Sequence, residues 1–272
     1  MYKFAPPILY AGVPVPGKIV PYIVGMVRNA SVNVSVEVSA SGGRGLRLSG
    51  QPAPDWRLRI ALESFVDVLS ERLEEELQVD VSYSVAAHDN VLLPSSSIYA
   101  ILTTAIVEAV AREGGYSLSS SELLEAARSI DEEAGVGLDY IDALRTALVH
   151  GKPMVYRRGE DYFELGRASV KLTMMGEVEV ESDISKSLDD NTLSLVAKLT
   201  SLATIEAAAR LRRGEDPLTY FPALSRIENS CFHLLYGVNP PDKKCKWTPS
   251  LQQAFNICVE GEGGEGWLEV SL

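Results

Sequence analysis

The sequence predicts an α+β fold, because two different periodicities follow one another along the chain. From Ser31 to Ser39, valines alternate with polar residues, which is typical of a half-exposed strand in an antiparallel sheet. From Leu92 to Val110, apolar residues recur at helical spacing, so one face of this segment is a continuous apolar stripe. Strand pairs interleaved with such helices indicate the α+β class.

The remaining elements of the first half follow from local signals. Ile8 to Val20 is apolar but broken by glycines and prolines, which predicts a strand, a tight loop and a second strand. Leu46 to Leu48 is expected to return as the next strand after a glycine-rich turn. Asp55 is placed to cap a long amphipathic helix, and Val79 to Val85 alternates as a further strand.

Two shorter helices and a hairpin are expected next. Ser119 and Glu122 have the spacing of a capping box, and Gly135 marks the end of that helix. Asp139 is expected to cap a second helix, which ends near Gly151. The segment 154–165 then predicts a hairpin.

The second half, residues 167–272, is expected to form a domain distinct from residues 1–166. Ser169 to Glu181 is strand-like, Pro217 to Tyr236 predicts a helix, and Leu251 to Phe255 predicts a short helix. Two edge-forming strands are expected around the glycine-rich loop 260–266. A long helix capped by Asp190 or Asn191 is expected to bury most of its apolar residues, which are Leu193, Val196, Leu199, Leu202, Ile205, Ala209 and Leu211.

Composition narrows the class of protein. The 272 residues are 46% hydrophobic and 23% charged, with a formal net charge of −12 and a pI near 4.8. No cluster of Lys and Arg breaks this acidity, so nucleic acid and anionic membranes are excluded as partners. No apolar run reaches the roughly 18 residues of a membrane span. Lys3 followed by Pro6 and Pro7 does not resemble a signal peptide, so a cytoplasmic protein is expected.

The cysteines and histidines offer little chemistry. Cys231, Cys245 and Cys258 do not have the spacing of a disulfide framework, which favours a reducing compartment. Cys231, His233 and Cys245 lack the paired spacing of a zinc site, so free thiols are expected. The other two histidines are isolated, which leaves a histidine-based mechanism without support.

Ser95, Ser96 and Ser97 stand directly before the apolar stripe of the 92–110 helix. Serines at such a position cap the helix. The open N–H groups and the positive dipole end of a helix also make a phosphate site. The local pattern alone allows both interpretations.

Several stretches resemble, in order, the motifs of the GHMP kinases, the family of galactokinase, homoserine kinase, mevalonate kinase and phosphomevalonate kinase. Val15–Val20 (Val-Pro-Gly-Lys-Ile-Val) is similar to Ala-Pro-Gly-Lys-Val, and Leu92–Ser97 (Leu-Leu-Pro-Ser-Ser-Ser) to Gly-Leu-Gly-Ser-Ser-Ala. Gly261–Trp267 (Gly-Glu-Gly-Gly-Glu-Gly-Trp) resembles Gly-Ala-Gly-Gly-Gly-Gly-Cys. Gly137-Leu138-Asp139 is similar to the Ser-Gly-Val-Asp turn that carries the catalytic aspartate, and Asn229–Val238 to a helix of mevalonate kinases.

The resemblance implies a fold, a reaction and a site. The fold would pair a ribosomal protein S5-like N-terminal domain with a ferredoxin-like C-terminal domain. The reaction would be ATP- and Mg²⁺-dependent transfer of the γ-phosphate to a hydroxyl of a small, mevalonate-like metabolite, by a monomer or homodimer. By this resemblance Lys18 and either Asp139 or Asp142 would be catalytic, Ser95, Ser96, Ser97, Gly261, Gly263 and Gly264 would hold the phosphates, and Ser96, Glu132 and Glu133 would hold the metal ion.

Two departures from the family pattern support an alternative. Leu92 and Pro94 replace glycines, and Pro94 also lacks an N–H donor. Glu262 and Glu265 place negative charge in a loop that would lie near phosphate. The alternatives are a degenerate GHMP-fold pseudokinase, acting as a binding or assembly protein, and an unrelated α+β family. The archaeal-type shikimate kinases, another branch, resemble this chain in having Ser-Ser-Ser without the middle glycine.

Overall fold

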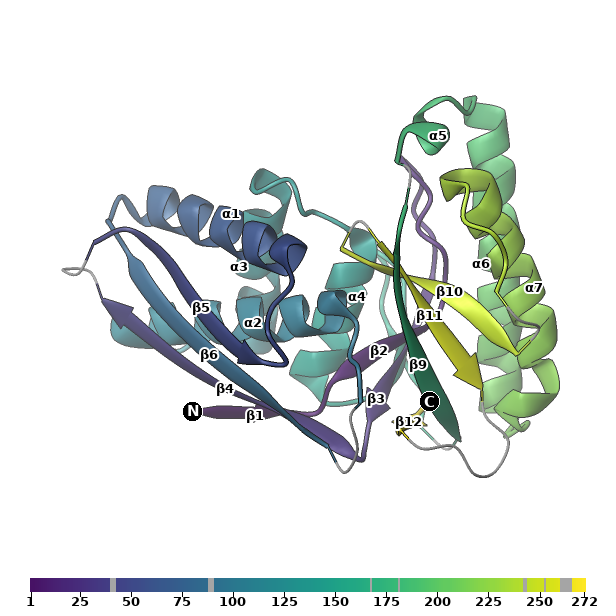
Figure 1. Ribbon diagram of the computed structural model, residues 1–272, viewed down its shortest axis with the longest axis horizontal. Coiled ribbons are helices and arrows are strands. Elements are labelled where there is room, and N and C mark those ends of the chain that lie inside the picture. Colours follow the sequence, from purple (N-terminus) through teal and green to yellow (C-terminus); the bar gives the residue numbers. More distant parts are fainter. Residues whose placement is uncertain are drawn as a thin grey trace.

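The computed structural model describes residues 1–39, 43–87, 91–166, 168–180, 182–241, 244–251, 253–259 and 266–272. Its two parts lie side by side, and each has helices against a sheet (Figure 1). The strands are β1 Tyr2–Phe4, β2 Pro7–Ala11, β3 Tyr22–Val27, β4 Ala30–Ser39, β5 Gly45–Gln51, β6 Gln78–Ala87, β7 Met154–Tyr156, β8 Phe163–Glu164, β9 Ser169–Glu179, β10 Cys245–Ser250, β11 Gln253–Val259 and β12 Trp267–Ser271. The helices are α1 Trp56–Leu73, α2 Ser95–Glu113, α3 Ser120–Glu133, α4 Asp139–His150, α5 Ser182–Lys186, α6 Asp190–Arg212 and α7 Pro217–Tyr236.

The smaller sheet has the strand order β1-β4-β6-β5. The strand predicted between Ser31 and Ser39 is confirmed as β4, which pairs antiparallel with β6 along its whole length. β5 runs parallel to β6 instead, because α1 connects the two strands as a crossover. The predicted Asp55 cap is confirmed, since its carboxylate accepts the Leu58 N–H at the start of α1. The antiparallel expectation therefore holds for β4 and not for β5.

The larger sheet has the order β10-β11-β9-β12-β3-β7-β8, with β2 also paired to β3. β12 pairs with β9 on one side and with β3 on the other, so this sheet contains strands from both sides of residue 166. The boundary at residue 166 stays a prediction. β11 and β12 are interior strands, not the predicted edge strands, because each lies between two others.

Four predictions about helices need correction. The N-cap of α6 is Asp189, not Asp190 or Asn191, because the Asp189 carboxylate accepts the Thr192 N–H. The short helix expected from Leu251 to Phe255 is wrong, because β10 and β11 form an antiparallel hairpin there and Leu251 has a left-handed backbone (φ 36°). Pro94, not a serine, is the N-cap of α2, and the three serines form its first turn. Asp139 is likewise the first residue of α4 and Leu138 its cap. The capping box at Ser119 is confirmed.

The predicted buried face of α6 is also wrong. Leu199, Leu202 and Ile205 are 44%, 66% and 56% exposed. The helix instead turns its small residues toward the protein, because these allow close approach to neighbouring elements. The buried residues of α6 are Val196, Thr200, Ala203, Thr204, Ala207, Ala208 and Leu211.

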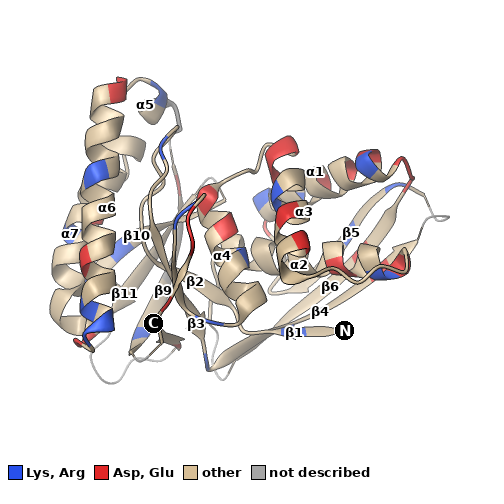
Figure 2. Cartoon of the chain, turned by 180° about the vertical axis from the view of Figure 1, so that it is seen from behind, with Lys and Arg blue, Asp and Glu red and all other residues tan. Residues whose placement is uncertain are grey.

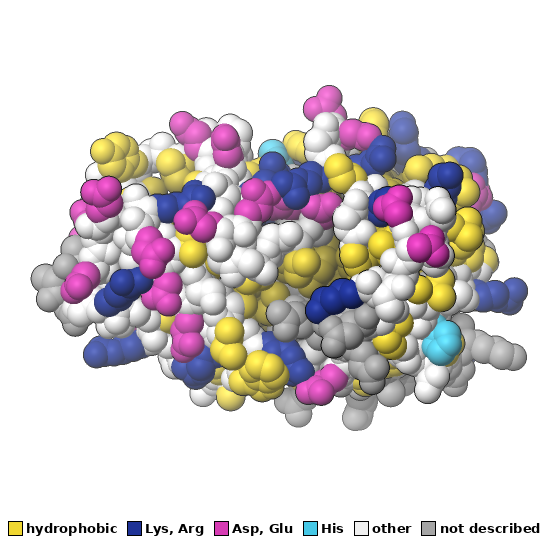
Figure 3. All heavy atoms as spheres, turned by 90° about the horizontal axis from the view of Figure 1, so that it is seen from above, with side chains coloured by type: hydrophobic (Ala, Val, Ile, Leu, Met, Phe, Trp, Pro, Cys, Tyr) yellow, Lys and Arg dark blue, Asp and Glu magenta, His cyan; other side chains and the backbone are white. Residues whose placement is uncertain are grey.

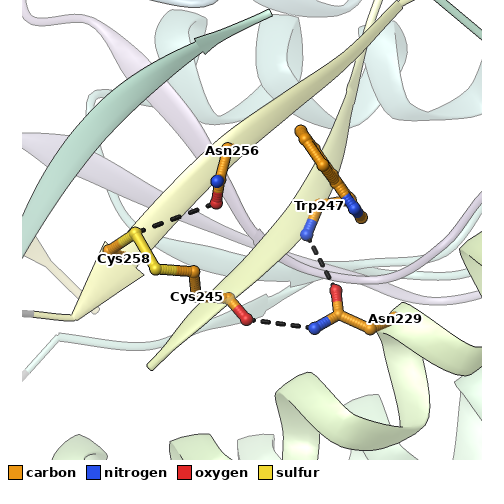
Figure 4. The surroundings of a disulfide bond; sticks show 5 residues. All are labelled: Asn229, Cys245, Trp247, Asn256 and Cys258. Carbon is orange, nitrogen blue, oxygen red and sulfur yellow. Dashed lines mark hydrogen bonds between the residues drawn. A yellow bond between two sulfur atoms is a disulfide. The ribbon is translucent and has the colours of Figure 1, made fainter. Parts of the chain in front are cut away.

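A disulfide joins Cys245 to Cys258, which contradicts the expectation of free thiols at these positions. The register of β10 and β11 sets the two cysteines directly opposite each other, with their Cα atoms 4.0 Å apart (Figure 4). Asn229 of α7 binds the same hairpin, through the Cys245 carbonyl and the Trp247 N–H. Cys231 is buried and unpaired. The cysteine count therefore does not indicate a reducing compartment.

Candidate functional site

The loop between β2 and β3, which carries Lys18, is anchored by the helices α6 and α7. The Gly12 N–H donates to Glu228 Oε1 at 2.6 Å, and the Val13 N–H donates to Thr200 Oγ1 at 3.0 Å. The Tyr236 hydroxyl donates to the Pro14 carbonyl at 2.9 Å. These bonds fix the backbone on one side of Lys18.

Lys18 and Asp139 line the same cavity, which has a volume of about 420 Å³. Its walls also include Tyr22, Arg158 and Tyr236. From above, Figure 3 shows hydrophobic side chains in a hollow near the middle of the molecule, with charged side chains of both signs along one rim. The cavity therefore offers a carboxylate and two cations around an apolar space.

Ion pairs link the charged groups of this cavity. Arg158 Nη1 donates to Asp139 Oδ1 at 3.1 Å, and Arg158 Nη2 bonds to Glu132. This hydrogen bond to Asp139 raises the pKa of Arg158 further above its ordinary value. Lys18 Nζ lies 2.5 Å from Asp190 Oδ1 at the start of α6. Arg158 thus binds Glu132 and Asp139 together, and it shares its cavity with Lys18.

Asp142 lies one helical turn after Asp139, but its side chain is in the interior. Its carboxylate accepts from Arg128 Nε at 2.6 Å and lies 3.6 Å from Arg145 Nη1. Arg145 is fully buried and donates to Asp131 at 2.7 Å. Burial raises the pKa of both Asp131 and Asp142 above the usual value, although the nearby arginines act in the opposite direction. Asp142 belongs to a buried ionic network.

The start of α2 is covered in this structure. Ser95, Ser96 and Ser97 are 8%, 1% and 1% exposed. The Ser95 hydroxyl donates to Asp55 Oδ2 at 2.5 Å, and the Ser97 hydroxyl donates to the Pro7 carbonyl at 2.6 Å. The Ser96 N–H points to Ser250 Oγ at 3.4 Å. Asp55, predicted only as a helix cap, thus also holds the serine turn, and no sequence signal marked Ser250 for its part.

The β10–β11 turn connects the start of α2 to the start of α4. Ser250 contacts Ser96, and the next residue, Leu251, donates its N–H to the Tyr140 hydroxyl at 3.1 Å. A second cavity of about 200 Å³, lined in part by Trp56 and Leu251, shares Leu138 with the cavity of Lys18 and Asp139. The β10–β11 turn therefore lies between the serine turn and Tyr140, the residue that follows Asp139.

The described residues do not form a metal cage. No group of three His, Cys, Asp or Glu side chains comes together among them. Glu133 pairs with Arg72 at 2.7 Å, whereas Glu132 pairs with the cavity residue Arg158. Ser96 and these glutamates therefore do not fit a preformed Mg²⁺ site. Gly261, Gly263 and Gly264 lie outside the described residues.

No model of a protein family matches the sequence, and no curated protein sequence matches it either. The structure does match solved structures along almost its whole length. These are mevalonate, phosphomevalonate and heptose-phosphate kinases and a mevalonate diphosphate decarboxylase. The chain therefore has the fold of the GHMP kinase superfamily, as the motif order predicted.

The individual matches share the fold with this chain at moderate TM-scores and have low sequence identity. L. major mevalonate kinase, solved with R-mevalonate, has a TM-score of 0.63 and 11% identity over 96% of this chain and 87% of its own. Enterococcus faecalis mevalonate diphosphate decarboxylase has a TM-score of 0.60 and 10% identity, covering 99% and 95%. Streptococcus pneumoniae phosphomevalonate kinase has a TM-score of 0.57 and 9% identity, covering 96% and 91%. At such identities the similarity extends to the fold alone.

Proposed function

We propose that this chain is an ATP-dependent kinase that transfers the γ-phosphate to a hydroxyl of a small metabolite. The proposal rests on one observation, the cavity that Lys18 and Asp139 both line. Phosphoryl transfer requires positioning and charge neutralisation more than covalent chemistry. Asp139 would orient and deprotonate the acceptor hydroxyl, and Lys18 would stabilise the charge that develops. Of the two candidate aspartates, Asp139 is preferred because Asp142 is committed to Arg128 and Arg145.

The acceptor would be a small anion. In a chain with a net charge of −12, Lys18 and Arg158 are the cations of this cavity, and a carboxylate or phosphate ester would bind them by displacing carboxylates such as Asp190, the partner of Lys18. A volume of about 420 Å³ suits a metabolite of mevalonate size. We place this reaction in the cytoplasm, where ATP is available, and we expect neither nucleic acid nor membrane as a partner.

ATP would bind with its phosphates at the start of α2. Two solved neighbours support a nucleotide: a phosphomevalonate kinase in complex with AMPPNP, and a decarboxylase described by its ATP-binding mechanism. Ser95–Ser97, with Gly261, Gly263 and Gly264, would supply the donors. Because Asp55 and Ser250 cover the serine turn, ATP binding requires both to move away from it. Mg²⁺ would arrive with the phosphates, and we assign no step to it.

The test is a transfer assay with the purified chain. ATP and Mg²⁺ are offered with a panel of hydroxy acids and their phosphate esters, and ADP and the phosphorylated product are measured. Asp139→Asn and Lys18→Met are expected to lower kcat by about 100-fold or more, because general-base and charge-stabilising groups have effects of this size. Glu63→Gln, an exposed change on α1 that removes the same charge as Asp139→Asn, is the matched control.

A nucleotide-binding measurement accompanies this assay. ATP is expected to raise the melting temperature of the wild type and of Asp139→Asn alike, since Asp139 acts on the acceptor. If no acceptor is phosphorylated and ATP leaves the melting temperature unchanged, the kinase proposal is wrong. That result would favour the alternative, a pseudokinase that acts as a binding or assembly protein.

A further inference from the structure

The outer face of α6 has an arrangement of side chains that a monomer does not need. Its exposed large residues Leu195, Leu199, Leu202 and Ile205 are 57%, 44%, 66% and 56% exposed. Their spacing of three and four residues puts them on one stripe of the helix. The same helix buries mainly alanine and threonine. A helix that turns its small residues inward and its leucines outward indicates an interaction surface.

An apolar cavity continues this stripe. It has a volume of about 420 Å³ and lies between the second half of α6 and the β7–β8 hairpin. Ile205, Ala208 and Ala209 form its α6 wall, and Val155 and Phe163 its opposite wall. Phe163 is itself 57% exposed. The stripe thus consists of projecting leucines in the first half of α6 and a hollow beside its second half.

Charges alternate along the same helix. From its start to its end, α6 carries Asp190, Lys198, Glu206 and then Arg210 and Arg212, and Figure 2 shows this alternation of acidic and basic positions along the helix. Lys198 forms no ion pair within the described part of the chain, and Glu206 bonds to Arg210 of its own helix at 2.7 Å. In an antiparallel copy of α6 paired about Leu202, Lys198 of one helix lies opposite Glu206 of the other, so the centre of the helix is complementary in charge to itself.

We infer that the outer face of α6 is the interface of a symmetric homodimer, in which two α6 helices cross antiparallel about a two-fold axis at Leu202. This axis sets Leu202 against its own copy and Leu199 against Ile205 of the second copy. It also sets Lys198 opposite Glu206. Leu195 then meets Ala209, at the mouth of the apolar cavity, so each copy inserts a leucine into the hollow of the other. A two-fold interface requires such a self-complementary surface.

The size of this surface agrees with a dimer. The 23 residues of α6 span about 35 Å. With the β7–β8 hairpin beside it, a contact of this length covers an area on the order of the 800 Å² per partner that stable interfaces bury. A membrane is the competing occupant, since α6 is the described helix that by length and mean hydropathy could cross one. The charged side chains Lys198 and Glu206 near the centre of this surface disfavour its burial in the hydrocarbon of a bilayer.

The first experiment is sedimentation velocity of the full chain from about 1 to 100 μM. The wild type is expected to shift from monomer to dimer, and Leu202→Glu to raise the dissociation constant about 100-fold or more, because two like charges then face each other on the axis. Leu202 is exposed in the monomer, so circular dichroism and the melting temperature should stay unchanged. Leu73→Glu, at an exposed leucine of α1, is the matched control and should leave the dimer intact.

Charge reversal tests the register. Lys198→Glu and Glu206→Lys are each expected to weaken the dimer about 10-fold, and the double variant to restore it. A short bis-maleimide should cross-link Leu202→Cys into dimers. It should not cross-link Leu195→Cys, whose two copies lie about 21 Å apart along the helices, because each is seven residues from the axis. A wild type that stays monomeric at 100 μM overturns the inference. Lipid-dependent sedimentation with anionic vesicles, or a Leu202→Glu variant that dimerises as the wild type does, also overturns it.

Discussion

Asp139 and Asp142 lie one turn apart on α4 and meet opposite environments. Asp139 faces the cavity of Lys18; its side chain is 16% exposed and that of its partner Arg158 is 37% exposed. The Asp142 side chain is 7% exposed and lies between Arg128, which is 35% exposed, and Arg145, which is fully buried. Both aspartates are ion-paired, yet one pair is at the surface of a cavity and the other is in the protein interior.

This difference in environment gives the two aspartates different roles. A partly exposed ion pair contributes little to stability because water and salt screen it, so Asp139 is available to a ligand. A buried charge without its partner is expensive, so the Asp142 network must stay complete for the chain to fold. The hydrogen bonding of this network is incomplete, since Arg145 Nε and Nη1 have no hydrogen-bond partner among the described residues, although Nη1 lies 3.6 Å from Asp142. Asp139 is therefore the better candidate for a catalytic role, and Asp142 for a role in stability.

The largest expected effect is on stability. Arg145→Met leaves Asp131 and Asp142 buried without their shared cation, and we expect it to lower the free energy of unfolding by about 3–5 kcal/mol. Arg158→Met removes the partner of Asp139, where we expect a loss of about 0–1 kcal/mol. Urea denaturation followed by circular dichroism measures both. Equal losses for the two variants would contradict the distinction between the two aspartates.

A smaller difference is expected between the coupling energies of the two Arg–Asp pairs. Double-mutant cycles compare the coupling of Arg128 with Asp142 to that of Arg158 with Asp139, using Arg→Met and Asp→Asn at each pair. We expect a coupling of about 1–3 kcal/mol for the first pair, because its carboxylate is buried, and less than about 1 kcal/mol for the second. If the Arg158 pair couples as strongly as the Arg128 pair, Asp139 is as structural as Asp142.

Much of the fold could be predicted from the sequence because its signals are local. The alternation in β4 and the capping box of α3 depend on residues within a few positions of each other, and both are confirmed. The motif order that predicted the GHMP kinase fold is likewise read directly along the chain. The failures came where distant segments decide. α6 has an apolar residue on every face, so periodicity could not show that Thr200 would bond to the Val13 N–H and leave Leu202 outside.

The candidate site was predictable in residue type and not in environment. Lys18 and Asp139 were chosen from short motifs, and they line one cavity. The same motifs could not distinguish Asp139 from Asp142, because the difference arises from Arg128 and Arg158 on other elements. Nor could they show that Ser250, far along the chain, covers the serine turn. The pairing of Cys245 with Cys258 also depends on strand register, which cysteine spacing does not give.

The smallest expected effect is on the pH dependence of stability. Burial raises the folded-state pKa of Asp131 and Asp142 above 3.8, and Arg145 limits that rise. A carboxyl with a raised pKa contributes stability that is present below its unfolded pKa and lost as the pH rises through its folded pKa. Arg145→Met raises both folded pKa values further. We therefore expect its destabilisation to grow from pH 4 to pH 7, as measured by urea denaturation at each pH.

The exposed carboxylate Glu122 provides a comparison, because its pKa is shifted in the opposite direction from those of Asp131 and Asp142. The Ser119 side chain and backbone bond to Glu122 and lower its pKa below 4.5. The stability that Glu122 contributes is therefore present above about pH 4.5 and lost as the pH falls through its lower folded pKa. Glu122→Gln removes this contribution, so its small destabilisation should shrink on acidification, as Glu122 itself becomes protonated. The destabilisation of Arg145→Met should shrink too, because acid neutralises the buried Asp131 and Asp142. Adding 1 M salt separates them, because screening reduces effects at the exposed Glu122 and leaves the buried network nearly unchanged.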